Sequence, residues 1–399
     1  MRRVQTLWRL FKSQWQRYTL ISVGLLGVGF LLLYRLGSLT GGLSNREVTQ
    51  QLFSSSWHNL AHNPLNAPLT VVQWLLLTLF SHHGQTLARL PSVLFGILTL
   101  IAFAYVLRRW YGLRTAIFGT VLFGLSSWFL HISRLGTTDI LYLWAIPTLL
   151  AVHLAWQRYI AKPWASFLAI VALAALLYIP GLVWLIFISL LLHPRQFAAT
   201  WQHLKYWWAR VGLVVLFILL VAPLSWAFLR TPTLFQSWLG LPHTFEQPID
   251  TVKRLADSVS FFVFRGPKLP ELWLDRLPLL DIFSIVMVLL GSIFYGRHIL
   301  LPRTRLLVSL FVLGAVFFAL HGPVTFSLLV PIIYFVIAAG VGYLLHEWLR
   351  VFPRNPLARS VGFGLLGVVI ILSCTYNVRA YFVAWPHSPT TSITFHNRR

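Results

Sequence analysis

Carboxylates are scarce in this sequence, which has nine Asp and Glu residues against 32 Lys and Arg residues. Each is therefore a candidate for acid or base chemistry. Glu47 lies near the start of a segment whose apolar residues have the spacing of a short amphipathic helix at a membrane surface. A carboxylate there could take the proton from a hydroxyl nucleophile. Ser44-x-x-Glu47 also fits a capping box, in which the carboxylate only accepts a backbone hydrogen bond. The residues alone leave both interpretations open.

Asp139 is the second candidate, because it follows Ser133-Arg134-Leu135-Gly136-Thr137-Thr138 between two apolar stretches. The position also suits an acid at a helix start, where the helix dipole favours negative charge and a threonine supplies the cap. A carboxylate deep in lipid costs about 2.5 to 3.5 kcal/mol on insertion scales, so an acid at a helix mouth indicates a wet cavity only weakly. Catalysis and helix capping both remain open for Asp139.

Cations that could hold a phosphate are found near these acids and in a long polar segment, residues 230–276. Mixed charges in such a segment are more typical of a solvated surface than of a site. An enzyme that acts on a lipid phosphate nevertheless needs cations at the membrane boundary, and Arg134, Arg265 and Lys268 are the nearest candidates.

The pattern of histidines and cysteines predicts neither a metal site nor a cofactor. Fourteen histidines are scattered without the spacing of a zinc-binding motif. The only cysteine, Cys374, lies in an apolar stretch, so no disulfide framework or thiolate metal site is available. We therefore expect a reaction that needs no cofactor and involves only the protein and its substrates.

The elements that position these residues are membrane helices. Hydrophobic residues make up 57% of the chain, charged residues only 10%, and the mean hydropathy is +0.74. Apolar runs without period-2 alternation predict an all-α polytopic transmembrane bundle of about eleven membrane helices, with residues 1–399 as a single integral membrane domain. The expected spans are 19–34, 88–107, 113–130, 140–156, 165–177, 181–192, 211–229, 277–295, 306–320, 327–345 and 361–377.

The distribution of charge predicts the orientation. The net charge of +23 lies in short basic clusters between apolar runs, which is typical of cytoplasmic loops beside anionic lipid and argues against nucleic-acid binding. We therefore expect a multi-pass protein of the cytoplasmic membrane with its N-terminus inside. Residues 37–87 form a first external loop, in which 69–80 is an interfacial helix too short to span, and 230–276 form a long external loop. Every carboxylate except Glu347 then lies outside.

Several stretches, in this order along nearly the whole chain, resemble the GT-C glycosyltransferases that use polyprenyl-phosphate sugars. The resemblance is to the protein mannosyltransferase-like group, glycosyltransferase family 39, and its ArnT-like bacterial relatives. The stretches are Gly42-Leu43-x-x-x-Glu47, Asn63-Pro64-Leu65, Arg89-Leu90-Pro91-Ser92-x-Leu94-Phe95-Gly96, Arg108-Arg109-x-Tyr111-Gly112, Ser133-Arg134-Leu135 with Asp139, and Arg276-Leu277-Pro278-Leu279-Leu280-Asp281.

The resemblance implies helices on the membrane surface in the first external loop, a lipid-linked sugar donor, and an acceptor that approaches from outside. It also implies that Glu47 is the general base and that Asp139 assists it. Arg46 stands where the family has the aspartate of an Asp-Glu pair. We expect Arg46 to bind substrate and Arg134, with Arg265 or Lys268, to stabilise the departing phosphate.

The expected function is sugar transfer from a polyprenyl-phosphate carrier to a glycan, lipid or protein acceptor at the outer face of the membrane. One alternative is a lipid-oligosaccharide flippase or other transporter, although the chain lacks the internal repeat that many transporters have. A second is a catalytically silent GT-C scaffold, because the Asp of the pair is replaced by Arg46.

Overall fold

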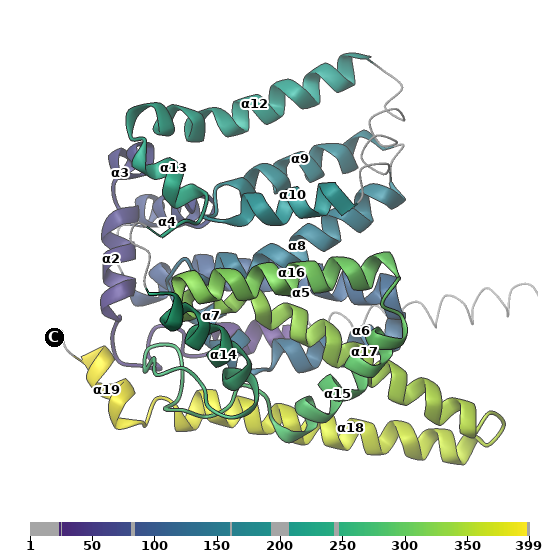
Figure 1. Ribbon diagram of the computed structural model, residues 1–399. Helices are drawn as coiled ribbons and strands as arrows, with labels where there is room; N and C mark the ends of the chain where they lie inside the picture. The colour runs from purple at the N-terminus through teal and green to yellow at the C-terminus, as the bar shows by residue number, and fades with distance from the viewer. Residues whose placement is uncertain are drawn as a thin grey trace, which may run out of the picture.

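The computed structural model describes residues 24, 26–80, 84–159, 162–192, 207–242 and 247–396. Within these ranges every regular element is a helix, and most run roughly parallel to one another in a bundle (Figure 1). The predicted all-α membrane fold is confirmed. Because backbone polar groups have no water to bond in lipid, helices that satisfy them internally are the expected solution.

The long helices are α5 (Gln85–Tyr111), α8 (Asp139–Arg158), α12 (Trp207–Arg230), α16 (Pro302–His321), α17 (Leu329–Val351) and α18 (Pro356–Arg379). The shorter elements are α2 (Asn45–Ser54), α3 (Trp57–His62), α4 (Ala67–Leu79), α6 (Leu113–Gly124), α7 (Ser127–Arg134), α9 (Pro163–Leu177), α10 (Leu182–Leu192), α13 (Thr233–Trp238), α14 (Pro248–Val263), α15 (Ile282–Arg297) and α19 (Pro389–His396), with the turns η1 (Pro323–Leu328) and η2 (Ala380–Ala384).

The expected number of spans is not confirmed. Within the described ranges, six helices are long and apolar enough to cross a membrane, or seven if the bent pair α6 and α7 is one span. Three expected spans form the shorter helices α9, α10 and α15, of 15, 11 and 16 residues. A crossing needs about 20 residues, so these three do not meet the criterion. Residues 19–23 and 25 of the expected span 19–34 lie outside the described residues, and the rest is helical at residue 24 and over 26–33.

The expected span 113–130 is broken in the structure, where α6 and α7 meet at an angle of 62°. The Ser126 hydroxyl accepts a hydrogen bond from the N–H of Phe129 at 3.4 Å and so caps α7. Ser127 is bound to Asn377 of α18 by two hydrogen bonds, of 3.1 and 2.8 Å. Because both sides of the break are satisfied, α7 can turn into the interior, where all eight of its residues are buried.

Close helix packing forms the core. Phe103 of α5 stacks on Phe335 of α17 with ring centroids 4.4 Å apart. A Cβ at Gly340 of α17 would lie 2.1 Å from the carbonyl oxygen of Met287 in α15, so only glycine permits this approach. On the other side of the bundle, α12 is only 11% buried over its most apolar window. The rigid framework is therefore the half built from α5 to α8 and α15 to α17.

The helices of the first loop gather at one end of the bundle, together with α7, α13 and α14 (Figure 1). Helix α4 has 13 residues and buries Leu69, Gln73 and Leu77. Its other face is apolar and exposed, including Val71, Leu75 and Leu79. This two-sided apolar character in a helix too short to span agrees with the interfacial helix expected from the sequence.

The segment 230–276 holds more structure than a loop. It contains α13 and the 16-residue α14, and the chain then returns so that the N–H groups of Leu279 and Leu280 bond the carbonyls of Phe261 and Phe262 at 3.0 and 3.1 Å. This return carries Glu271 back to the start of α2. The end of the bundle that holds α2 thus receives residues from four distant parts of the sequence.

Candidate active site

Glu47 lies in the first turn of α2 and is fully buried. Its Oε1 accepts hydrogen bonds from Arg89 Nε at 2.7 Å and from the N–H of Gly136 at 2.8 Å. Its Oε2 accepts from Arg89 Nη2 at 2.8 Å and from the N–H of Ser44 at 3.0 Å. The Ser44 hydroxyl accepts from the N–H of Glu47 at 3.2 Å, so the predicted capping box is present.

These contacts bear on the role of Glu47 as general base, which stays a prediction. A carboxylate has about four lone-pair positions, and N–H donors bond Glu47 at four points. With no exposed surface, it cannot also accept a proton from an acceptor hydroxyl in this arrangement. Glu47 instead ties the start of α2 to α5 and to the turn before α8.

Arg89 in α5 completes this tie. Besides Glu47, its guanidinium donates to the carbonyl oxygens of Leu36 and Gly42, both at 2.9 Å, and to the Thr40 hydroxyl at 3.2 Å. Only 3% of the side chain is exposed. The fork of Arg89 matches the carboxylate bidentately, which is the arrangement that makes a buried charge pair tolerable.

Asp139 begins α8, and its carboxylate is fully buried. Oδ1 accepts a hydrogen bond from Arg46 Nη2 at 2.7 Å. Oδ2 has no hydrogen-bond partner among the described residues. No threonine side chain caps α8, so the capping interpretation of Thr137 and Thr138 is not confirmed. Asp139 therefore has one anchored oxygen and one oxygen whose hydrogen-bonding capacity is unused.

Arg46 joins Asp139 to a third acid, Glu271. Its Nη1 lies 4.0 Å from Glu271 Oε2, and the Ser44 hydroxyl donates to Glu271 Oε1. The Arg46 side chain is 36% exposed and that of Glu271 13%. Position 46, where the resembling family has an acid, thus carries a cation between two carboxylates.

Burial and charge act against each other in this group. Burial lowers the pKa of Arg46, but attraction to Asp139, the hydrogen bond to Asp139 and attraction to Glu271 outweigh it and raise that pKa overall. Burial raises the pKa of Glu271, and the Ser44 hydrogen bond and Arg46 offset only part of the rise. Glu271 is therefore more basic than an exposed glutamate.

The turn between α7 and α8 brings Glu47 and Asp139 together. The N–H of Gly136 bonds Glu47, and its carbonyl accepts from Gln73 Nε2 at 3.3 Å. A Cβ at Gly136 would lie 2.9 Å from the carbonyl oxygen of Ala88, so this position requires glycine. Because Asp139 follows three residues later, the anchored turn fixes the start of α8 against α2.

Arg134 ends α7, is buried, and faces another environment. One Nη donates to the carbonyl oxygen of Tyr34, and the guanidinium lies 5.1 Å from the ring centroid of Tyr381 and 4.7 Å from that of Phe382. Its Nε and Nη1 have no hydrogen-bond partner among the described residues. A buried cation with unused donors is able to bind an anion, and the phosphate-binding role of Arg134 stays a prediction.

Arg265 and Lys268, the other two expected phosphate contacts, are exposed on the chain that follows α14. Neither forms an ion pair with Glu47, Asp139 or Glu271. The structure therefore brings Arg46, Glu47 and Asp139 together, places Arg134 against Tyr34, Tyr381 and Phe382, and leaves Arg265 and Lys268 outside the cluster.

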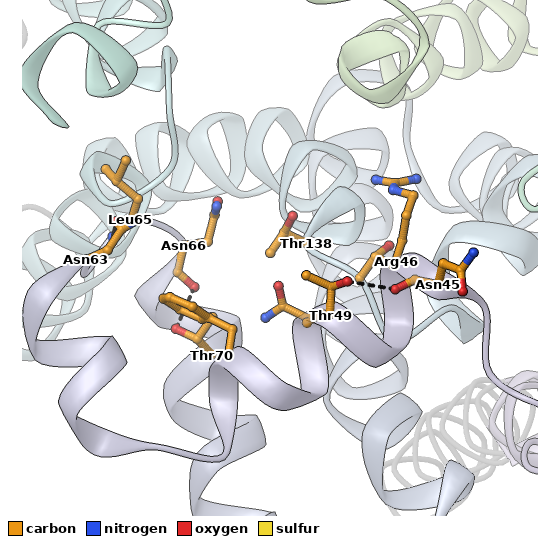
Figure 2. Close-up of a pocket in the computed structure, with 11 residues that line it drawn as sticks. Asn45, Arg46, Thr49, Asn63, Leu65, Asn66, Thr70 and Thr138 are labelled. Carbon is orange, nitrogen blue, oxygen red and sulfur yellow. Dashed lines mark hydrogen bonds between the residues drawn. The ribbon is translucent and has the colours of Figure 1, made fainter. Parts of the chain in front are cut away.

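A cavity of about 520 Å³ opens beside Arg46 (Figure 2). Its volume falls in the range of about 300 to 1,000 Å³ typical of small-molecule sites. It is bounded by α2, by the connection between α3 and α4, and by the turn before α8. The lining residues from these three segments include Asn45, Arg46, Thr49, Gln50, Phe53, Asn63, Leu65, Asn66, Thr70, Thr137 and Thr138.

Sequence reasoning missed Arg89, Glu271 and the cavity. Arg89 was considered only as part of a stretch that carries the resemblance, although a buried arginine requires an acidic partner and Glu47 was available. Glu271 gave no signal, because only the folding of residues 230–276 brings it to α2. The cavity is formed by uncharged residues that are common at helix starts and turns.

Comparisons with known proteins agree with this architecture. Residues 66–226 match the family model described as dolichyl-phosphate-mannose-protein mannosyltransferase. The fold is similar to that of ArnT from Cupriavidus metallidurans bound to undecaprenyl phosphate, with a TM-score of 0.55 and 17% identity over 95% of this chain and 77% of that chain. The apo state of that protein gives 0.54 and 16% over the same shares. A search of curated proteins found no significant match.

The family match covers α4 to α12, and so includes Arg89, Arg134 and Asp139 but begins after Arg46 and Glu47. At 17% identity the structural likeness establishes the fold. Together these findings confirm the resemblance predicted from the sequence.

Proposed function

From the premise that this chain is a membrane protein of the GT-C glycosyltransferase type, similar to ArnT and the protein mannosyltransferases, we propose that it transfers a sugar from a polyprenyl-phosphate carrier to an acceptor hydroxyl. The observation that carries the proposal is the buried carboxylate of Asp139, which has one unpartnered oxygen and is bonded through the other to Arg46, a residue that lines the polar cavity. The α2 end of the bundle faces the outside of the cytoplasmic membrane, as the charge pattern predicts.

Asp139 acts as the general base in this proposal. The acceptor oxygen forms a bond to the anomeric carbon while the bond from that carbon to the phosphate oxygen breaks. The hydroxyl proton passes to Asp139 Oδ2, and the polyprenyl phosphate leaves with the electron pair. A positioned base contributes on the order of 10² to 10⁴ in rate. Single displacement of this kind inverts the anomeric centre.

Arg46 links this carboxylate to the cavity. It bonds Asp139 and lines the cavity, so it lies between the base and the substrate. The leaving phosphate is a stronger anionic partner than one shared carboxylate, because it can take both forks of the guanidinium. In this proposal donor binding draws Arg46 from Asp139, which leaves the carboxylate free to accept the proton of the acceptor hydroxyl. Arg134, the last residue of α7, supplies further positive charge for the leaving phosphate.

Glu47 and Arg89 hold this apparatus in place without touching substrate. Through the N–H of Gly136, Glu47 fixes the turn that precedes Asp139. We therefore assign Glu47 as a positioning residue.

The test is transfer by the purified protein in lipid nanodiscs, supplied with polyprenyl-phosphate donors that carry radiolabelled sugars. We expect release of polyprenyl phosphate coupled to labelled acceptor, and at least a 100-fold loss in kcat for Asp139→Asn. Ser55→Ala, an exposed change at the end of α2, is the control. Full activity in Asp139→Asn would remove Asp139 from the mechanism.

The scaffold alternative draws support from the same ion pair, because Arg46 neutralises Asp139 in this arrangement. A silent scaffold would bind the donor without releasing polyprenyl phosphate for any sugar. A transporter would move donor across sealed vesicles without transfer. The nanodisc assay, repeated in sealed vesicles, separates these three functions.

A further inference from the structure

The end of the bundle opposite α2 holds a group of aromatic side chains with an arginine on it. The hydroxyls of Tyr111, the last residue of α5, and Tyr295 of α15 are hydrogen-bonded to each other. Arg303, in the first turn of α16, lies with its guanidinium 5.4 Å from the ring centroids of both Tyr111 and Phe294. Because an α-helix rises 1.5 Å per residue, Tyr111 is about 33 Å along α5 from Arg89. This group is therefore separate from the candidate active site.

Arg303 is a cation without an acidic partner. Its Nη1 donates to the carbonyl oxygen of Trp110 at 3.3 Å, and its Nε is buried without a hydrogen-bond partner among the described residues. Within the described ranges, no ion pair joins an acid to Arg303 or to its neighbours Arg297 and Arg305. The aromatic rings hold the guanidinium by cation–π attraction, which uses none of its N–H donors. Arg303 can therefore bind a phosphate, whose oxygens match the fork of an arginine.

An apolar cavity of about 330 Å³ lies beside this group, between α15, α16 and α17. Tyr295 lines it, and so does Thr304, which directly follows Arg303 in the chain. Most of the other lining residues are aliphatic, and two of them, Ile299 and Val308, are exposed at the surface of the bundle. A hydrocarbon chain in the surrounding bilayer can therefore enter the cavity.

The connection between α15 and α16 indicates how deep this group lies. Its residues Ile299 and Leu300 are 53% and 82% exposed although both are apolar. Helix α15 has 16 residues, a length of about 24 Å, whereas the hydrocarbon core of a bilayer is about 30 Å thick. A helix this short is accommodated by local thinning of the bilayer. We therefore expect the connection to lie in the boundary of the bilayer, which places Arg303 at the depth of lipid phosphates.

We propose that this end of the bundle binds one anionic phospholipid, with its phosphate on Arg303 and one acyl chain in the cavity between α15, α16 and α17. The charge pattern predicts that this end faces the cytoplasm, so the lipid belongs to the leaflet on that side. Basic pockets between membrane helices on that side suit anionic headgroups. Arg297 and Arg305 add attraction for the negative charge. The site is independent of the proposed function, which concerns the other end of the bundle.

Two variants test the two parts of the site, each with a matched control. Arg303→Met removes the cation, and Arg354→Met removes an exposed arginine from the connection between α17 and α18. Val308→Trp fills the cavity, and Val312→Trp places the same ring one turn further along α16, at an exposed position that does not line the cavity. Because Val308→Trp leaves Arg303 in place, it tests the proposal even if Arg303→Met fails to fold.

The measurement is thermal unfolding of the delipidated full chain in detergent, with three additions compared. Dioleoylphosphatidylglycerol is anionic, dioleoylphosphatidylcholine has the same chains but no net charge, and glycerol 3-phosphate has the charge without the chains. We expect only phosphatidylglycerol to raise the unfolding temperature when present at a small excess over the protein. Arg303→Met and Val308→Trp should each raise the concentration needed for half of this effect by about tenfold, the equivalent of about 1.4 kcal/mol. The two controls should leave that concentration unchanged.

Equal stabilisation by the two phospholipids, or stabilisation by glycerol 3-phosphate alone, would overturn the proposal. An unchanged response in Val308→Trp, or an equal loss in Arg303→Met and Arg354→Met, would overturn it as well. Undecaprenyl phosphate added as a competitor should not displace phosphatidylglycerol, and displacement would assign the site to a polyprenyl carrier instead. None of these measurements depends on sugar transfer, so failure of the proposed function leaves their results unchanged.

Discussion

Two ion pairs lie together at the α2 end of the bundle and differ in how fully their charges are satisfied. Glu47 accepts four hydrogen bonds and is paired bidentately with Arg89. Asp139 accepts one from Arg46 and keeps an oxygen without a partner among the described residues. Both carboxylates are fully buried. Burial is thus the same for both acids, and it is the number of donors that distinguishes the positioning role proposed for Glu47 from the catalytic role proposed for Asp139.

The difference also concerns the cations. Arg89 is held on every side by backbone carbonyls and by Glu47, while Arg46 is 36% exposed and lines the cavity. If Arg89 turned toward a substrate, it would leave the charge of Glu47 buried without its partner. Arg46 can turn toward a substrate, because part of its side chain is already exposed at the cavity. We infer that the Glu47 pair stabilises the site and that the Asp139 pair reacts to ligand.

The largest expected effect comes from breaking the saturated pair. Arg89→Met leaves Glu47 buried without its counter-ion, and removal of one partner of such a pair costs about 3 to 5 kcal/mol. We expect a large drop in the thermal unfolding temperature of the purified protein, with activity lost as a consequence.

Arg46→Met is the matched control, because it removes the cation of the more exposed pair. Asp139 is itself buried, so the unfolding temperature should also fall, but by less than with Arg89→Met, because Arg46 gives its acid one hydrogen bond where Arg89 gives two. Equal destabilisation by Arg89→Met and Arg46→Met would contradict the contrast between the pairs.

A smaller loss is expected from Gly136→Ala, which tests how the two pairs are joined. The added Cβ would lie 2.9 Å from the carbonyl oxygen of Ala88 and 3.4 Å from Glu47 Oε1, so the turn must shift. Forced repacking of this kind costs about 1 to 3 kcal/mol. We expect lower kcat together with a lower unfolding temperature.

Gly367→Ala in α18 is the control, since a Cβ there meets nothing within 4 Å. Alanine should even favour this helix by about 0.5 to 1 kcal/mol. If Gly136→Ala behaved like Gly367→Ala, the turn would not position Asp139 through Glu47.

The contrast between the pairs explains what could be predicted from sequence. The membrane class and the all-α fold follow from hydropathy, because each apolar run is a local signal. The gathering of Glu47 with Asp139 was also expected, since the charge pattern placed both acids on one side. The capping box of Ser44 and Glu47 is local as well and was recognised as an alternative.

Other features depend on tertiary contacts and had no local signal. The bend between α6 and α7 is satisfied by Asn377, 250 residues away from Ser127. The return of Glu271 to Ser44 spans 227 residues. The saturation of Glu47 requires donors from α5 and from the turn before α8. A pattern of residue types identified the candidate acids, but only these long-range contacts decide which acid is available for chemistry.

Arg46→Lys should affect function more than stability. Lysine keeps the charge but cannot present two parallel donors to a phosphate. We expect the KM for the polyprenyl-phosphate donor to rise by about tenfold, with the unfolding temperature shifting by less than that of Arg89→Met. An unchanged donor KM would indicate that Arg46 serves only as counter-ion to Asp139.

The smallest expected effect is a pH dependence from Glu271. Burial raises the pKa of this acid above its usual value of 4.5, so the folded protein binds a proton where the unfolded chain does not. Stability should therefore fall as pH rises from the unfolded pKa through the folded pKa, and level off above it. Unfolding temperatures measured from pH 4 upward in about half-unit steps test this, with Glu271→Gln flattening that part of the profile. Because Ser44 and Arg46 offset part of the rise, the slope is modest. If Glu271→Gln made the unfolding temperature fall more steeply with pH, the prediction would be wrong. The folded protein would then stabilise Glu271 as an anion, as the hydrogen bonds around Glu47 do for that acid.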